Sequence, residues 1–148
     1  MATSGAAVFP RIHAAQFNER SGGHLPGHLG VVIVEVGNGF LRSFLDVQAH
    51  HLAPNGYLHA ASVIALADTS AGYACFAHMP DGMENFTTIE LKANFLSTVR
   101  AGRIDCEARA VHLGRSTQLW EARVSNAANG RLMATFQCTQ LLLAPRGP

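Results

Sequence analysis

Charged residues are scarce in this sequence. They make up 14% of its 148 positions, whereas apolar residues make up 48%. Soluble domains carry roughly 25% charged residues, and the centres of obligate subunit interfaces are depleted of charge. The shortage of charge therefore indicates that part of the surface is covered by another subunit.

The sequence also lacks a dominant sign of charge. Its net charge is +1, and its 11 lysines and arginines are scattered along the chain. Nucleic-acid-binding proteins usually show a basic stripe, so we expect no nucleic-acid partner. A few of these cations could still gather around a phosphorylated ligand.

Paired cysteines and membrane segments are missing as well. Cys75, Cys106 and Cys138 have no paired spacing, and two of them lie in alternating apolar patterns, which indicates core thiols in a reducing compartment. Residues 1–10 lack the basic start and apolar run of a signal peptide. No stretch approaches the ~20 apolar residues of a transmembrane helix. We therefore expect a cytoplasmic protein that does not enter a membrane.

Metal-ligand spacing is absent too. His50 and His51 form a loop pair, and His24 and His28 lie in a stretch rich in glycine and proline. None of these spacings is typical of a zinc site. We expect neither a metal nor another cofactor.

The first third of the chain reads as a short helix and a hairpin. A helix is predicted from about Ala6 to Arg20, followed by a Gly/Pro-rich loop over residues 22–27. β-Branched residues predict a strand over Val31 to Val36. The Asn38-Gly39 pair is a turn signal, after which Phe40 to Val47 returns as a second strand.

One long helix follows a polar stretch. His59 to Ala77 is rich in alanine, leucine and isoleucine, and Pro80 lies just beyond it. Length and alanine content favour a helix over a strand. Because this helix is apolar almost all round, it must be wrapped by other elements.

The remaining chain supplies this wrapping as four strands. Apolar and polar side chains alternate in four segments, whose apolar members are Ile89, Leu91, Ala93 and Phe95; Ile104, Cys106, Ala108 and Ala110; Trp120, Ala122 and Val124; and Leu132, Ala134, Phe136 and Cys138. Such patterns are typical of an antiparallel sheet with one buried face. We predict one α+β domain over residues 1–148, a curved antiparallel sheet around one long helix, which is the hotdog fold.

Asp68 is the most unusual residue of the central helix. It lies within an Ala-Leu-Ala-Asp-Thr segment, and carboxylates are rarely buried unless they are paired or functional. The alternative is an aspartate on a narrow solvated stripe or bonded to nearby backbone.

The start of the same helix offers a second feature. The backbone N–H groups near Ala60 and Ala61 lack helical partners, and their small side chains let a ligand carbonyl approach. Ala60 and Asp68 are separated by about 12 Å along the helix, so one reacting carbonyl cannot contact both. If both serve one reaction, they must come from different subunits.

These residues resemble the signature of a known family. Pro54 to Ala61, followed by Val63 to Thr69, is similar to hotdog thioesterases of the phenylacetyl-CoA and hydroxybenzoyl-CoA type. In that family a His-Gly-Gly opens the central helix, and an acid follows nine residues after the histidine. His59 and Asp68 have this spacing, although both glycines are alanines here.

The resemblance implies the roles of several residues. The Ala60 N–H would polarise the thioester carbonyl, and Asp68 of the other subunit would attack it or activate water. Asn55 would replace an upstream asparagine of the family, whose usual position is occupied by Ala53. Thr88 matches a hydroxyl that orients water, unless it is only a strand-forming threonine. His59 would hold the helix start in place rather than act as a base.

The same resemblance implies an acyl-CoA substrate and a homo-oligomer, a dimer or a homotetramer built as a dimer of dimers, with the active site between subunits. We expect substrate contacts from Ala61 and Thr69, from an aromatic lining and from cations that face the CoA phosphates, namely Tyr73, Phe86, Arg100, Arg103 and Arg115. The aromatics could instead only pack the core, and the arginines could be plain surface charges. A hydratase or dehydratase and a non-catalytic acyl-CoA-binding module remain the alternative functions.

Overall fold

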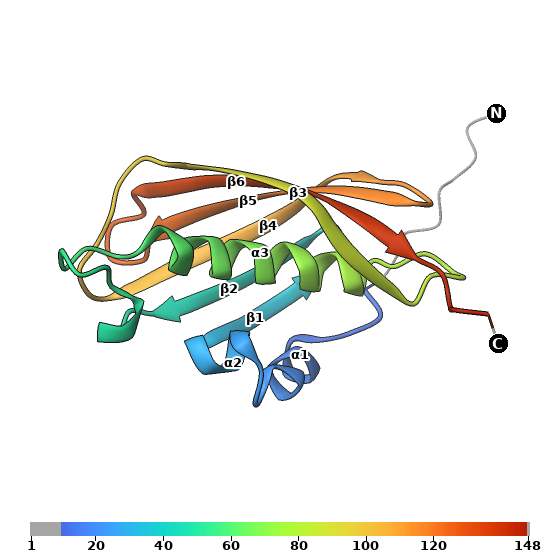
Figure 1. The fold of residues 1–148 in the computed structure, drawn as a ribbon, viewed down its shortest axis with the longest axis horizontal. Helices are drawn as coiled ribbons and strands as arrows, with labels where there is room; N and C mark the ends of the chain where they lie inside the picture. Colours follow the sequence, from blue (N-terminus) through green and yellow to red (C-terminus); the bar gives the residue numbers. More distant parts are fainter. Residues whose placement is uncertain (1–9, 148) are drawn as a thin grey trace.

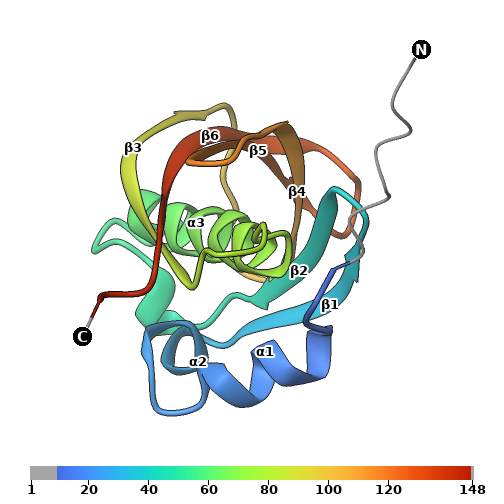
Figure 2. The same ribbon diagram turned by 90° about the vertical axis from the view of Figure 1, so that its right-hand side faces the viewer.

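The computed structural model describes residues 10–147, in which six antiparallel strands form one sheet in the order β1-β2-β4-β5-β6-β3. The sheet curves around the single long helix α3, Ala60–Ala77 (Figures 1 and 2). The predicted α+β hotdog fold is confirmed. The strands are β1 Val31–Gly37, β2 Phe40–Asp46, β3 Asn85–Phe95, β4 Arg103–Leu113, β5 Thr117–Asn126 and β6 Leu132–Leu143.

The core lies between α3 and the concave face of the sheet. Small side chains on the buried side of the helix, such as Ala67, Ala71 and Ala74, let it approach the strands closely. Trp120 of β5 fills the largest space and is fully buried. All three cysteines are free and buried, as their apolar surroundings predicted.

The N-terminal helix is shorter than predicted. Of the expected helix from Ala6 to Arg20, residues 6–9 lie outside the described part, and α1 spans Ala14–Ser21. The helix begins after His13, whose N–H donates to the side chain of Gln16 at 2.9 Å.

The predicted Gly/Pro loop over residues 22–27 is wrong in part, because a five-residue helix, α2, spans Leu25–Leu29. Its first turn tolerates Pro26, and Gly30 ends it in the left-handed conformation with φ 81°. A 3₁₀ turn, η1, spans Ala49–His51.

Helix α1 covers one of the two sheet edges. The Asn18 amide accepts from the Ile33 N–H and donates to the Ile33 carbonyl, both at 2.8 Å, so it replaces a neighbouring strand. An edge strand without such cover is a site for pairing with another chain. Both short helices lie on the β1 side (Figure 2), and β3 forms the opposite edge.

Strand β3 departs from the predicted buried pattern. Ile89, Leu91 and Phe95 are 56%, 42% and 46% exposed. The register with β6 shifts between Thr88 and Glu90, which places Ile89 in a bulge. Beyond this bulge Ala93 still packs against the core, whereas Leu91 and Phe95 stay exposed in the described chain.

Helix α3 is likewise not enclosed all round. Ile64, Ala65, Asp68 and Thr69 form a half-buried flank that continues to exposed Ala60 and Ala61 at the start of the helix. We call these six residues the open flank of α3. By length and composition alone, the helix could cross a membrane. However, just over half of it is buried inside the sheet, as is typical of a core helix.

Candidate active site

Asp68 lies on the open flank with its carboxylate turned partly inward. Its Oδ1 is buried and has no hydrogen-bond partner among the described residues. Because burial disfavours the charged form, the pKa of Asp68 is raised above its ordinary value. A buried carboxylate without partners is costly for the fold, and such groups concentrate at functional sites.

Two predicted residues, Phe86 and Thr88, lie on strand β3, which packs against α3. The Phe86 ring packs on Gly72, where an added Cβ would lie 3.0 Å from Cζ of Phe86. Strand β3 runs opposite to α3 (Figure 1). Going from Phe86 to Thr88 advances about 6.6 Å along the strand, and going back from Gly72 to Asp68 covers about 6 Å along the helix. Thr88 therefore lies level with Asp68.

Strand β6 pairs with β3 and contributes Gln140 and Cys138 next to Thr88. The Thr88 hydroxyl donates to Oε1 of Gln140 at 2.8 Å, and Nε2 of Gln140 contacts Sγ of Cys138 at 3.3 Å. Burial raises the pKa of the Cys138 thiol to about 12, and the Asp68 carboxylate adds to this shift. Sequence reasoning missed Gln140, although it occupies an inward position of an otherwise apolar alternation.

The start of α3 distinguishes between the two predicted carbonyl-binding groups. Nδ1 of His59 accepts from the Ala61 N–H at 2.9 Å, so this N–H is already occupied. The Ala60 N–H has no acceptor among residues 10–147. Ala60 can therefore receive a ligand carbonyl, whereas Ala61 contributes only its small side chain to the site. An accepting Nδ1 leaves the proton of a neutral His59 on Nε2, which fits a capping role.

His51 anchors this helix start, a role that its interpretation as a loop histidine missed. It is 1% exposed, and its Nε2 donates to the Leu29 carbonyl at 2.7 Å. Its own carbonyl accepts from the His59 N–H at 3.0 Å and from the Ser62 hydroxyl at 2.8 Å. His51 thus connects α2 to the first turn of α3. The sequence does not single out His51, because it stands next to a second histidine, His50, which is exposed.

Asn55 lies in the loop before α3, at the end of the molecule that carries Ala60. It is exposed, and its side chain accepts from the Tyr57 N–H at 3.1 Å in a local turn. The structure therefore places Asn55 near the carbonyl-binding end of α3 and away from Asp68 of the same chain.

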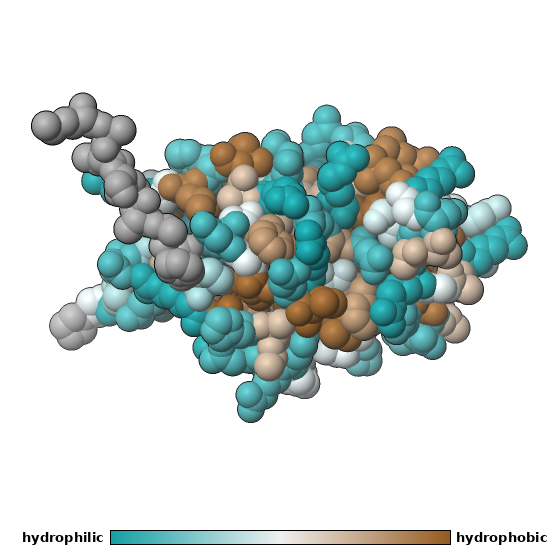
Figure 3. All heavy atoms as spheres, turned by 180° about the vertical axis from the view of Figure 1, so that it is seen from behind, coloured by the Kyte–Doolittle hydropathy of each residue, from teal (hydrophilic) through white to brown (hydrophobic). Residues whose placement is uncertain are grey.

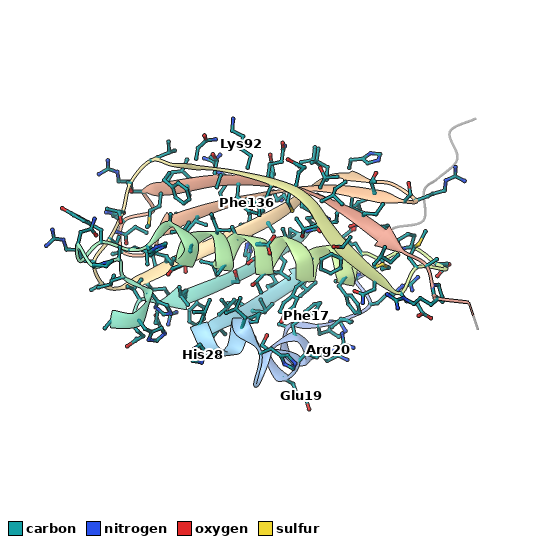
Figure 4. The ribbon with its side chains drawn as sticks, viewed as in Figure 1. Phe17, Glu19, Arg20, His28, Lys92 and Phe136 are labelled. Carbon is teal, nitrogen blue, oxygen red and sulfur yellow. The ribbon has the colours of Figure 1, made fainter. Side chains whose placement is uncertain are left out.

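Tyr73, which was predicted to join an aromatic substrate lining, packs against α1 and not beside Asp68 of the same chain. Its ring stacks on Phe17 of α1 at 4.5 Å between centroids, and its hydroxyl lies 2.8 Å from that of Ser21. Five helical residues turn Tyr73 about 140° away from Asp68. Phe17 and Arg20 mark this α1 side in Figure 4. Of the predicted aromatic residues, Phe86 remains beside Asp68.

The three arginines divide between the two ends of the sheet. Arg100 lies beside the start of α3, with its guanidinium 4.3 Å from the Tyr57 ring centroid. Arg103 is at the same end but pairs with Asp46 at 2.8 Å, and this pairing lowers the pKa of Asp46. Arg115 lies in the β4–β5 turn, about 30 Å away along β4. Within one subunit the predicted cationic rim is therefore divided.

Within residues 10–147 no three histidine, cysteine, aspartate or glutamate side chains gather as metal ligands. The polar groups of the open flank are the Asp68 carboxylate, the Thr69 hydroxyl and the Ala60 N–H, which has no acceptor among residues 10–147. These groups are suited to acyl transfer to water: the N–H binds a carbonyl oxygen and the carboxylate serves as base or nucleophile.

The raised pKa of Asp68 predicts a shifted pH profile. If activity needs the ionised carboxylate, kcat/KM should rise with pH through a pKa above the ~3.9 of a free aspartate and then level off. The folded chain binds this proton more tightly than the unfolded chain, so Asp68 protonation itself favours folding at low pH. Kinetics across pH 4–8, with circular dichroism at each pH, would check this. Full activity below pH 4 would contradict it.

Comparison with known proteins identifies the family of this chain. The model of the thioesterase superfamily matches residues 55–133, which include the open flank and β3. A 1,4-dihydroxy-2-naphthoyl-CoA hydrolase of Listeria monocytogenes is 32% identical over 112 residues, covering 75% of this chain and 89% of the relative. A proofreading thioesterase of Klebsiella pneumoniae is 33% identical over 107 residues, covering 72% and 77%.

A solved structure extends the agreement to the whole fold. The thioesterase structure from Haemophilus influenzae superimposes with a TM-score of 0.86 at 22% identity, covering 93% of this chain and 95% of the other. At this identity the likeness concerns the fold alone. The match over residues 55–133 and the relatives above 30% identity confirm the predicted resemblance. This chain belongs to the thioesterase superfamily.

Proposed function

We propose that this protein hydrolyses the thioester of an acyl-CoA to a free acid and CoA. The observation that carries the proposal is the Asp68 carboxylate, whose buried Oδ1 has no partner among residues 10–147. It lies on the same open flank as the Ala60 N–H, which lacks an acceptor in that part of the chain. Membership of the thioesterase superfamily and the named hydrolase and thioesterase relatives support the same reaction.

Each site residue has one role in this proposal. The Ala60 N–H, at the positive end of α3, polarises the thioester carbonyl. Asp68 attacks that carbon or takes a proton from water, and Thr88 holds the water. His59 and Asn55 shape the helix start, while Thr69 and Phe86 flank the acyl group.

The proposal requires two subunits, because about 12 Å of helix separates Ala60 from Asp68. A two-fold axis beside the open flanks would run two α3 helices antiparallel and bring each Asp68 to the partner's Ala60. The edge of β1 is covered by Asn18, whereas β3 exposes Ile89, Leu91 and Phe95 beside the open flank. Because these exposed apolar side chains lie on the uncovered edge strand, we propose the β3 edge as the contact.

A dimer is the smallest assembly that completes the site. We keep a homotetramer, a dimer of dimers, as the larger proposal, since apolar patches also interrupt the hydrophilic surface on the face seen from behind (Figure 3). Cations of two chains would then meet CoA, with Arg100 beside the Ala60 of its own chain and Arg115 entering from a partner. A cytoplasmic location and the absence of membrane and nucleic-acid partners belong to the same proposal.

The acyl group is proposed to be aromatic. Phe86 packs on Gly72 one turn beyond Asp68 and presents a ring to the site, and aromatic pairs gain about 0.5–1.5 kcal/mol beyond burial. The Listeria relative is named for a naphthoyl thioester. The alanines at positions 60 and 61 also narrow the entrance for bulky branched chains.

A panel of acyl-CoA thioesters with detection of the released thiol tests both reaction and substrate. We expect kcat/KM for benzoyl- or phenylacetyl-CoA to exceed that for palmitoyl-CoA by about 10- to 100-fold, because an apolar pocket discriminates by only ~1–3 kcal/mol. Phe86→Leu should reduce this preference. Tyr73→Phe is the matched control, since Tyr73 faces α1, and should keep it.

Three outcomes of this panel are informative. A preference for palmitoyl-CoA over every aryl thioester would reject the aromatic substrate but retain the reaction. Loss of enoyl absorbance without thiol release would indicate a hydratase instead. Tight binding of acyl-CoA without turnover would indicate a binding module.

A further inference from the structure

Gln140 is a polar residue at a strand position where the alternation predicts an apolar core residue. It is fully buried on the inward side of β6, between Cys138 and Leu142. Burying a carboxamide costs free energy unless its groups are hydrogen-bonded. Gln140 meets this cost through two side-chain contacts rather than through a partner in the opposite layer.

Those two contacts fix the orientation of the amide. Nε2 of Gln140 is directed at Sγ of Cys138, 3.3 Å away, so its Oε1 faces β3. There Oε1 accepts the proton of the Thr88 hydroxyl at 2.8 Å. The residues are also a direct backbone pair of the β3–β6 ladder, which holds the distance between the two side chains.

A hydroxyl that has donated its proton can only accept further hydrogen bonds. We infer that Gln140 is a positioning residue of the active site, which turns the Thr88 hydroxyl so that its lone pairs receive a proton of the attacking water. This inference rests on the proposed thioesterase function and gives Asp68 the role of general base.

The reaction then has a defined arrangement of atoms. One water O–H donates to Thr88 Oγ1 and the other to the Asp68 carboxylate, which leaves an oxygen lone pair for the thioester carbon. The C–O bond forms as Asp68 takes the proton, and the carbonyl oxygen is held at the partner's Ala60. The C–S bond then breaks, the CoA thiolate leaves and the proton passes from Asp68 to the thiolate.

A double-mutant cycle between positions 88 and 140 tests this inference. Thr88→Val and Gln140→Met keep shape but remove the hydroxyl and the acceptor. Each should lower kcat by about 10- to 100-fold with little change in KM, the scale of a misplaced reactant. Because both act through one water, Gln140→Met should cost no more than about twofold in the Thr88→Val background. Thr88→Ser should restore most of the activity.

Several results would overturn the inference. If Gln140 only supports the fold, Gln140→Met would lower the melting temperature and would reduce kcat by the same factor in the wild-type and Thr88→Val backgrounds. A normal kcat in folded Gln140→Met would reject it directly. If that variant does not fold, Gln140→Asn keeps the amide but falls one methylene short of Thr88, and the same loss of kcat is expected. The wild-type protein, assayed in parallel, distinguishes failure of this inference from failure of the proposed function: if it releases no thiol from any acyl-CoA, the proposed function itself is rejected, whereas full activity of Asp68→Asn would remove Asp68 as the base.

Discussion

Replacement of Asp68 by asparagine is expected to lower kcat by at least ~100-fold, the scale for loss of a general base or nucleophile. The two side chains have the same shape, and the carboxylate has no ion pair or hydrogen bond at Oδ1 that the substitution would break. KM should change little, because binding of the CoA portion does not involve this group. Steady-state kinetics with the best thioester of the panel would measure both constants.

The stability of the same variant provides an internal control. An ionised Asp68 is disfavoured by burial, so a neutral asparagine should leave the melting temperature unchanged or raise it slightly. Loss of activity together with a retained or higher melting temperature would identify a catalytic role. Near-normal turnover in the folded Asp68→Asn protein would remove Asp68 from the mechanism.

The fold was predictable from the sequence because the long apolar helix and the alternating apolar and polar residues of the strands are both unambiguous patterns. The inward residues of β4 and β5 alternate as expected, and those of β6 do so from Ala134 on, after Met133, which is buried out of phase. Helix α3 begins one residue later than predicted and ends at Ala77 as predicted. The errors fall where an element is exposed in the single chain. Alternation in β3 predicted burial, but periodicity reports which side chains share a face and not whether that face has a neighbour.

The site was predictable only where one residue departed from its local pattern. Asp68 interrupts an apolar helix, and this departure led to the open flank. Tyr73 is aromatic among apolar residues, so its contact with α1 could not be distinguished from a substrate lining. The occupied N–H of Ala61 and the amide of Gln140 depend on contacts between side chains and distant backbone, which a single sequence does not encode in any fixed spacing.

The site also connects the shortage of charge with catalysis. The open flank and the exposed side of β3 are apolar around one carboxylate, as a water-excluding interface would be. In the single chain Asp68 faces solvent on one side and lacks a carbonyl-binding N–H within reach. A second subunit would exclude water, keep the pKa of Asp68 raised and supply that N–H. Assembly and activity should therefore be linked.

Complementation between two inactive variants is the sharpest test of this link. Asp68→Asn removes the carboxylate, and Ala60→Pro removes the carbonyl-binding N–H. Proline suits the first position of a helix, and His59, with φ −69° and ψ 137°, already has the extended backbone that precedes proline. Each variant alone should be nearly inactive, and both should fold.

In a two-fold mixed dimer one site combines the intact Asp68 of one chain with the intact Ala60 of the other, while both defects meet in the second site. Random reassociation of equal amounts makes half of the dimers mixed, so about a quarter of the wild-type sites should be restored. The matched control replaces the Ala60→Pro chain with one that carries both substitutions, and it should restore none. A site built within one subunit would instead leave every mixture inactive. Absence of rescue, with mixed dimers demonstrated by affinity tags on the two chains, would therefore reject the shared site.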